Sequence, residues 1–291
     1  MIRPVLGTAA LASSALFAAA ALAAPTQDIA YVKVAGSVNE LYVVNHDGTG
    51  LTKVYATAKK HGITALDFSP AGDELAFVER ASGSPAVLKR LRLKDSGAAD
   101  GAPVAVPNLC GTVDYVDYNP TDPSVLMISG FCNQQIYVGR VGVDGTGFAT
   151  LQQGNANLYV SEGRWLRDGV SYIYVKSVQP NVQMLCRDGC DPNAGQLLWS
   201  GTQIVWNDVA RTTDSVIFTD NVGNMRLVDQ SGTEVTPPVA SGRDAHFSPG
   251  DDAIIYRTPH QASGDYVLIY DFNVSRRVTG KGEWGPVDWR P

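Results

Sequence analysis

The stretch "LDFSPAGDELAF", residues 66 to 77, places an aromatic residue, a Pro and Gly turn and a second apolar run in one short segment. Pro fixes φ and Gly or Asp tolerates a tight backbone, so this order predicts two strands joined by a turn. The pattern recurs in "VDYNPTDPSVLM" (116 to 127), "GRWLRDGVSYIY" (163 to 174), "NDVARTTDSVIF" (207 to 218) and "AHFSPGDDAIIY" (245 to 256). The segment is therefore a repeat unit.

Each repeat has an anchor residue nine positions before a large apolar residue, and a sixth anchor stands in "GPVDWRP" (285 to 291). The anchors are Phe68, Tyr118, Trp165, Val209, Phe247 and Trp289, spaced 50, 47, 44, 38 and 42 residues apart. This period is typical of four-stranded propeller blades. Third β-rich runs follow at "LYVV" (41 to 44), "VLKRLRL" (87 to 93), "IYVGRV" (136 to 141), "QMLCR" (183 to 187), "MRLVD" (225 to 229) and "VLIYD" (267 to 271).

The chain has six third runs but only five complete first-to-second turns. The missing second strand is "DIAYV" (28 to 32), where Tyr31 takes the place of Phe77 and Tyr256. We therefore expect the strand around Trp289 to be the innermost strand of the blade that residues 28 to 55 begin. This closure pairs sheet edges that would otherwise be exposed. The predicted fold class is all-β, a six-bladed β-propeller of four-stranded antiparallel blades.

The N-terminus has the features of a cleaved signal peptide. Arg3 is the positive residue, "VLGTAALASSALFAAAALA" (5 to 23) is an apolar region, and residues 21–23 offer an A-x-A cleavage site. An N-terminal membrane anchor is the alternative. We expect residues 1–23 to be removed and 24–291 to form one monomeric domain, periplasmic or secreted, not inserted in a membrane. The remaining 22 basic and 29 acidic side chains give a net charge of −7, which argues against a nucleic acid partner.

The repeat resembles that of TolB-like six-bladed β-propellers. The shared pattern is aromatic-Ser-Pro-x-Gly-Asp, an apolar run, Ile/Leu-Tyr and Asp-Gly-Thr, seen in "FSPAGDELAF", "ELYVVNHDGTGLTKV" and "FSPGDDAIIY". The resemblance covers almost all of the mature chain and implies the fold, with a protein partner in the cell envelope. Because strands are expected within a few residues of the cleavage site, we expect the chain to lack the N-terminal domain of TolB. In addition, "RWLRDG" and "DVARTTD" lack the Ser-Pro.

The four cysteines are even in number, and export permits disulfides. Cys186 and Cys190 are close enough in "CRDGCD" to close one turn, with a metal half-site as the alternative. In a propeller, Cys110 and Cys132 fall in two loops on the same face, flanking one blade. We therefore predict the pairs Cys110 to Cys132 and Cys186 to Cys190.

The residue before each anchor is expected to face the central channel, because strand side chains alternate. These residues are Asp67, Asp117, Arg164, Asp208, His246 and Asp288. They could hold Ca²⁺, which favours several oxygen ligands, or receive a cationic side chain of a partner. Alternatively they are the polar wall of a water-filled tunnel, with Arg164 paired to Asp117 or Asp208. We expect no required cofactor, and leave Ca²⁺ as a possibility.

No linear motif of a hydrolase elbow, a zinc helix or a phosphate-binding loop occurs in the chain. We therefore expect a non-enzymatic module that binds an envelope protein or peptide. Its loop face would carry His61, Arg80, His260 and Tyr266. The alternative is a channel-mouth hydrolase or lyase acting on a sugar or lactone, or a Ca²⁺-dependent binder, since propeller enzymes assemble their sites from scattered residues.

Overall fold

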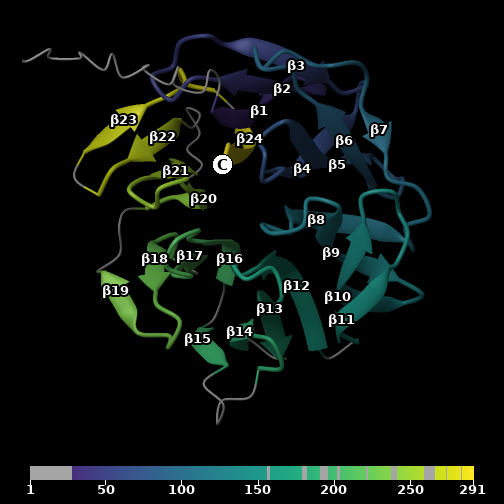
Figure 1. Cartoon of the computed structure of the whole chain (residues 1–291), viewed down its shortest axis with the longest axis vertical. Coiled ribbons are helices and arrows are strands. Elements are labelled where there is room, and N and C mark those ends of the chain that lie inside the picture. The colour runs from purple at the N-terminus through teal and green to yellow at the C-terminus, as the bar shows by residue number, and fades with distance from the viewer. Residues whose placement is uncertain are drawn as a thin grey trace, which may run out of the picture.

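The computed structural model describes residues 28–155, 158–178, 182–190, 196–201, 204–220, 222–236, 241–258, 266–272, 274–282 and 284–291. The expected signal segment, residues 1–23, lies outside them. The described residues form six four-stranded antiparallel sheets, which stand as blades around a central axis (Figure 1). The predicted propeller fold is confirmed. Within these ranges, no helix has the length and apolar character needed to cross a membrane.

The blades are numbered in chain order, with the innermost strand of each given first. Blade 1 is β24 (Trp284–Trp289), β1 (Ile29–Ala35), β2 (Val38–Val44) and β3 (Thr52–Ala56). Blade 2 is β4 (His61–Phe68), β5 (Glu74–Ala81), β6 (Val87–Arg92) and β7 (Val104–Ala105). Blade 3 is β8 (Thr112–Tyr118), β9 (Val125–Cys132), β10 (Gln135–Gly142) and β11 (Ala149–Gln153).

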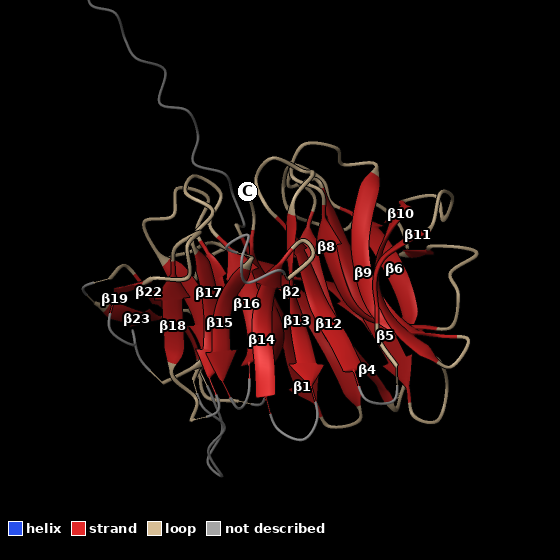
Figure 2. Ribbon diagram, turned by 90° about the horizontal axis from the view of Figure 1, so that it is seen from below, coloured by secondary structure: helices blue, strands red, loops and turns tan. Residues whose placement is uncertain are grey.

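The other three blades repeat this order. Blade 4 is β12 (Leu158–Trp165), β13 (Tyr172–Val178), β14 (Val182–Arg187) and β15 (Leu197–Gly201). Blade 5 is β16 (Ile204–Val209), β17 (Val216–Asp220), β18 (Met225–Val228) and β19 (Glu234–Thr236). Blade 6 is β20 (Arg243–Phe247), β21 (Ile254–Arg257), β22 (Val267–Tyr270) and β23 (Ser275–Arg277). The strands run between two loop-bearing faces (Figure 2). We call the face with the first-to-second turns the turn face, and the opposite one the loop face.

The Ser-Pro motif forms the first-to-second turn through side-chain hydrogen bonds. The Ser69 hydroxyl donates to Asp73 Oδ1 over 2.8 Å and accepts from the Glu74 amide over 3.1 Å. Ser248 makes the same pair of contacts in blade 6, with Asp252 and the Ala253 amide. The motif is therefore a local turn device, which explains why it could be recognised from sequence.

The hydrophobic core is divided among the interfaces between neighbouring blades. Six clusters of buried residues each combine side chains of two adjacent blades, including the pair formed by blades 6 and 1. In that last cluster Trp289 packs with Tyr31 and Ile255. The ring is thus held by apolar burial at every interface, and its closure depends on the C-terminal strand.

Strand β24 closes the ring by pairing with β1. Ile29 lies opposite Trp289, and Tyr31 lies opposite Val287, in an antiparallel register. Trp289 is 6% exposed and Val287 is fully buried. The predicted split blade, with its innermost strand from the C-terminus, is confirmed.

Both predicted disulfides are present. Cys110 pairs with Cys132 across a Cα separation of 5.4 Å, and Cys186 pairs with Cys190 across 4.8 Å. The first bond joins the loop between blades 2 and 3, which carries Cys110, to Cys132 at the end of β9. None of the four cysteines is free. Such bonds indicate an oxidising compartment.

Removing residues 285–291 should lower the melting temperature sharply, because it exposes the edges of blade 1 and removes Trp289 from the interface with blade 6. The single change Trp289→Ala should lower the free energy of unfolding by about 3–5 kcal/mol. Denaturant titration measures both. Phe131→Ala, at a side chain 47% exposed, is the control and should cost at most about 1 kcal/mol. A deletion variant that melts with the full-length protein would disprove this closure.

Candidate functional site

The structure places the six pre-anchor residues at one level of the central channel. Each lies near the C-terminal end of an innermost strand and pairs with the second strand at the same register, as in Asp67 opposite Ala76 and His246 opposite Ile255. The set is Asp288, Asp67, Asp117, Arg164, Asp208 and His246, in order around the ring. Strand alternation thus brings residues from six repeats together.

The four carboxylates of this ring link neighbouring blades at four of the six interfaces. In each case one carboxylate oxygen accepts a hydrogen bond from the backbone amide of the anchor in the following blade. The bonds run from Phe68 to Asp288 (2.7 Å), Tyr118 to Asp67 (2.6 Å), Trp165 to Asp117 (2.8 Å) and Phe247 to Asp208 (2.8 Å). The ring carboxylates are therefore structural groups, with one oxygen each already used.

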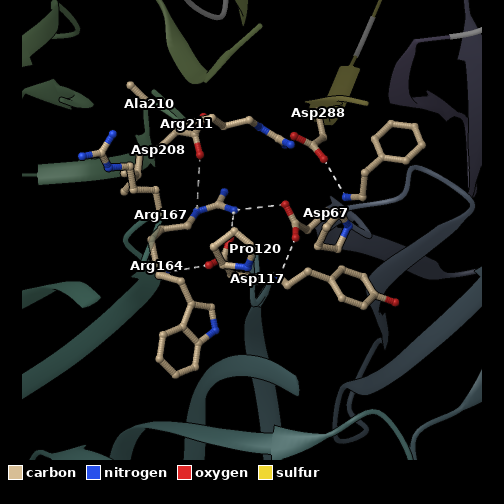
Figure 3. A pocket seen from close by; sticks show the side chains of 14 residues that line it. Asp67, Asp117, Pro120, Arg164, Arg167, Asp208, Ala210, Arg211 and Asp288 are labelled. Atoms are coloured by element: carbon tan, nitrogen blue, oxygen red, sulfur yellow. Dashed lines mark hydrogen bonds and ion pairs between the residues drawn. The ribbon is translucent and has the colours of Figure 1, made fainter. Parts of the chain in front are cut away.

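Arg164 neutralises the carboxylates on one side of the ring. Its Nη1 lies 2.7 Å from Asp117 Oδ1 and 3.3 Å from Asp67 Oδ1, and its Nε lies 4.0 Å from Asp208 Oδ1 (Figure 3). Its Nη2 donates to the Tyr115 hydroxyl over 2.7 Å. Burial, together with the charges of Asp117 and Asp288, raises the pKa of Asp67 well above its usual value. The buried guanidinium is therefore held at all of its nitrogens.

His246 serves the other side of the ring. Its Nδ1 lies 3.3 Å from Asp288 Oδ1 and 3.8 Å from Asp208 Oδ2, and its Nε2 lies 3.5 Å from Asp244 Oδ1. Burial alone would lower the pKa of His246, but these three carboxylates outweigh it and raise the pKa to about 10. The imidazole is therefore a cation at neutral pH.

Sequence reasoning missed Asp244 and Tyr115. Asp244 Oδ2 accepts from the Val287 amide over 2.8 Å, which supplies the link from blade 6 to blade 1 that His246 cannot make as a cation. Burial acts to raise the pKa of Asp244, but Arg257 and His246 hold it below its usual range. Both residues stand two positions before a ring residue, Asp244 before His246 and Tyr115 before Asp117, so their place in the repeat could have been noticed in the sequence. A bulge in each of these innermost strands shifts the register at that point, and simple alternation therefore does not predict where these side chains face.

The channel opens into a cavity on each face. The turn-side cavity, of about 290 Å³, is lined by ring residues and by Pro70, Pro120, Arg167 and Arg211 (Figure 3). The loop-side cavity, of about 320 Å³, is lined by Asp114, Tyr159, Glu162, Asp244 and His246, among others. Arg164 lines both cavities and lies between them.

No cluster of three or more His, Cys, Asp or Glu side chains suited to a metal occurs in the described part of the chain. Each ring carboxylate gives one oxygen to a backbone amide, and the other faces Arg164 or His246. A cation in the ring would have to displace one of these two charges. Ca²⁺ binding there stays a prediction.

Of the expected loop-face residues, His61 and Arg80 lie close together at one end of blade 2, and a binding role for the group stays a prediction. His61 Nδ1 lies 2.6 Å from Glu79 Oε1, and Arg80 pairs with Asp114, all near one end of blade 2 or 3. Tyr266 lies in blade 6, with the Arg277 guanidinium 4.2 Å from its ring centre. His260 lies outside the described residues. Neither His61 nor Arg80 lines either of the two channel cavities.

Several solved structures are similar to this fold. TolB from Acinetobacter baumannii superposes with a TM-score of 0.69 at 14% sequence identity, over 91% of this chain and 67% of that one. The chain has the fold of TolB-like propellers. A chain of the nidogen/laminin complex matches with a TM-score of 0.64 at 8% identity, over 91% and 98% of the two chains. An oligogalacturonate lyase in complex with manganese matches at 0.50 and 14% identity, over 75% and 70%.

These similarities identify the architecture. In sequence, no family model matches the chain, and no curated protein is detectably similar to it. The TolB-like fold is shared by proteins whose names indicate different roles, a lyase among them. Because function depends on site residues that identities this low do not relate, the fold by itself leaves the activity open.

Replacing Arg164 by Met should lower the free energy of unfolding by about 3–5 kcal/mol, because three carboxylates lose their buried counter-charge. Chemical denaturation measures the change. The control is Arg92→Met, at a side chain 77% exposed and 3.8 Å from Glu74, which should cost about 0–1 kcal/mol. Equal effects of the two changes would contradict the role given to Arg164.

The His246 charge should make stability depend on alkaline pH. Its pKa in the folded protein is raised from 6.5 to about 10, so its contribution is complete below pH 6.5 and is lost as the pH rises toward 10. Wild type should therefore lose stability relative to His246→Gln across that window, by an amount on the order of a few kcal/mol. Urea titrations of both proteins from pH 6 to 10 measure the difference. Parallel pH profiles would show that the imidazole is not charged in the fold.

Proposed function

We propose that the chain is an exported TolB-like propeller that binds a protein or peptide of the bacterial cell envelope at a channel mouth, without catalysing a reaction. The observation that carries the proposal is the use of the ring side chains. Every ring carboxylate accepts an inter-blade amide bond and faces a cation. Groups held in this way stabilise the scaffold, and a general acid or base needs a side chain that is free to exchange a proton with a ligand.

Export is supported by the N-terminal sequence and by the two disulfides. An envelope location is supported by the resemblance of the repeat to TolB-like proteins. Binding at a mouth is supported by the two cavities, which are of the size that accepts a side chain or short segment. The loop-side cavity adds Tyr159, a tyrosine 46% exposed, of the kind enriched at binding interfaces.

A channel-mouth enzyme acting on an acidic sugar is the second candidate. The observation that favours it is Asp67, a carboxyl of raised pKa that lines the turn-side cavity. Since Asp67 also holds the Tyr118 amide and faces Arg164, catalysis would have to use a group that is already bonded. For that reason the binding role is preferred.

The proposal predicts that the mature protein captures a specific partner from an envelope extract, and that changes at one mouth abolish capture. Three baits are compared: wild type, Arg211→Glu at the turn-side cavity and Tyr159→Lys at the loop-side cavity. One of the two variants should reduce the recovered partner at least about tenfold, which corresponds to roughly 1.4 kcal/mol of binding energy. The control bait is Arg276→Glu, on the outermost strand of blade 6. Equal recovery on all four baits would refute binding at a mouth.

A further inference from the structure

The position two residues after each anchor distinguishes two of the six blades. In blade order from blade 1 it is occupied by Pro291, Pro70, Pro120, Arg167, Arg211 and Pro249. Blades 4 and 5 thus carry Arg where the other four carry Pro, and both arginines line the turn-side cavity (Figure 3). We propose that Arg167 and Arg211 form a carboxylate-binding pair, by which this mouth takes an acidic peptide segment. The inference rests on the proposed binding function and specifies its ligand.

A backbone requirement explains why these two positions are not Pro. The Arg167 amide donates to Asp214 Oδ1 and the Arg211 amide donates to Asp251 Oδ1, each over 2.9 Å. Both acceptors belong to the turn of the next blade, and Pro has no amide hydrogen to donate. Any other residue type would supply that hydrogen. The amides therefore account for the loss of Pro, and the choice of Arg at both positions needs a role for the side chains.

The two arginines lie in turns that are bonded to each other. Arg167 Nη1 donates to the Thr212 carbonyl over 2.7 Å, and its Nε lies 3.1 Å from Asp214 Oδ2, both within the turn that follows Arg211. Its side chain is nevertheless 55% exposed. For the Arg211 guanidinium, no carboxylate of the described residues lies within ion-pair distance. At the cavity rim, the Arg167 guanidinium is thus held in place by the turn of blade 5, and the Arg211 guanidinium has no carboxylate of the described residues within ion-pair distance.

The carboxylates of the cavity floor already have other partners. Asp208 and Asp288 each hold a backbone amide of the next blade, and Arg164 and His246 face their remaining oxygens. Because guanidinium groups bind carboxylates through two parallel hydrogen bonds, the rim favours an acidic side chain or a chain terminus.

A peptide fits the remaining surface of the cavity. Pro70 and Pro120 line it beside the charged groups, whereas the side chains of the anchors Phe68, Tyr118 and Trp165 are buried in the interface clusters. A volume of about 290 Å³ is at the small end of ligand cavities, so it admits a short segment. The expected ligand therefore places one or two carboxylates on Arg167 and Arg211 and packs its backbone against Pro70 and Pro120.

The test is a calorimetric titration of the mature protein with blocked peptides that differ only in charge. The probes are Ac-Gly-Glu-Glu-Gly-NH₂ and its Gln and Lys counterparts, with Ac-Gly-Gln-Gln-Gly-OH to separate a terminal carboxylate from side-chain ones. We expect the Glu peptide to bind at least about tenfold more tightly than the Gln peptide, with the preference weakened by salt. Arg167→Gln and Arg211→Gln keep the amides and should each remove most of this preference.

The matched control is Arg276→Gln, which makes the same charge change on β23 and should leave binding unchanged. Melting curves of all variants show that the fold is retained. If peptides bind but the preference for Glu is absent, or survives in both mouth variants, this inference fails and the binding function stands. If no peptide binds, this inference fails, and the proposed binding function is decided by the capture experiment with the Arg211→Glu and Tyr159→Lys baits. Binding of an oligogalacturonate probe alone, dependent on the same arginines, would assign the pair to the enzymatic alternative.

Discussion

The bond from a channel carboxylate to the anchor amide of the next blade is the contact on which the ring depends. Ring residues make it at four interfaces, and at a fifth Asp244 makes a similar bond to the amide of Val287, two residues before the anchor Trp289. Each such bond joins the innermost strands of two blades whose sheets are otherwise separate. The apolar clusters supply most of the buried area, but they are not directional. The carboxylate bonds set how one blade is placed against the next.

This use of carboxylates requires buried counter-charges. Five acids near the axis would repel one another, and Arg164 and His246 are placed where they face all of them. Removing one partner of a buried ion pair lowers the free energy of unfolding far more than removing one partner of an exposed pair. Arg164 and His246 are therefore needed for stability. For the proposed binding function, this leaves ligand recognition to the cavity rims, where side chains such as Arg211 and Tyr159 are not part of the ring.

Much of the site could be predicted from sequence because each blade repeats a local pattern. The six ring residues were identified as the residues one position before each anchor. Because side chains alternate along a strand, they were predicted to face the channel. The same counting failed for Asp244 and Tyr115, since a bulge shifts the register of each innermost strand just before the ring. The loop-face group stays a prediction. His61 and Arg80 belong to blade 2 and Tyr266 lies next to β22 of blade 6, and each of these side chains has a partner of its own.

By itself the sequence determined the six-bladed fold, the split first blade and both disulfides, because turns, strand periods and loop positions are local or follow from the repeat. It also showed that two repeats lack Pro two positions after the anchor, where Arg167 and Arg211 stand. Only the tertiary structure decided what the channel acids do, since their amide donors lie 39 to 51 residues along the chain or, for Asp288, 220 away. It likewise decided that Arg167 and Arg211 meet at one cavity, because that neighbourhood exists only once the blades have closed into a ring.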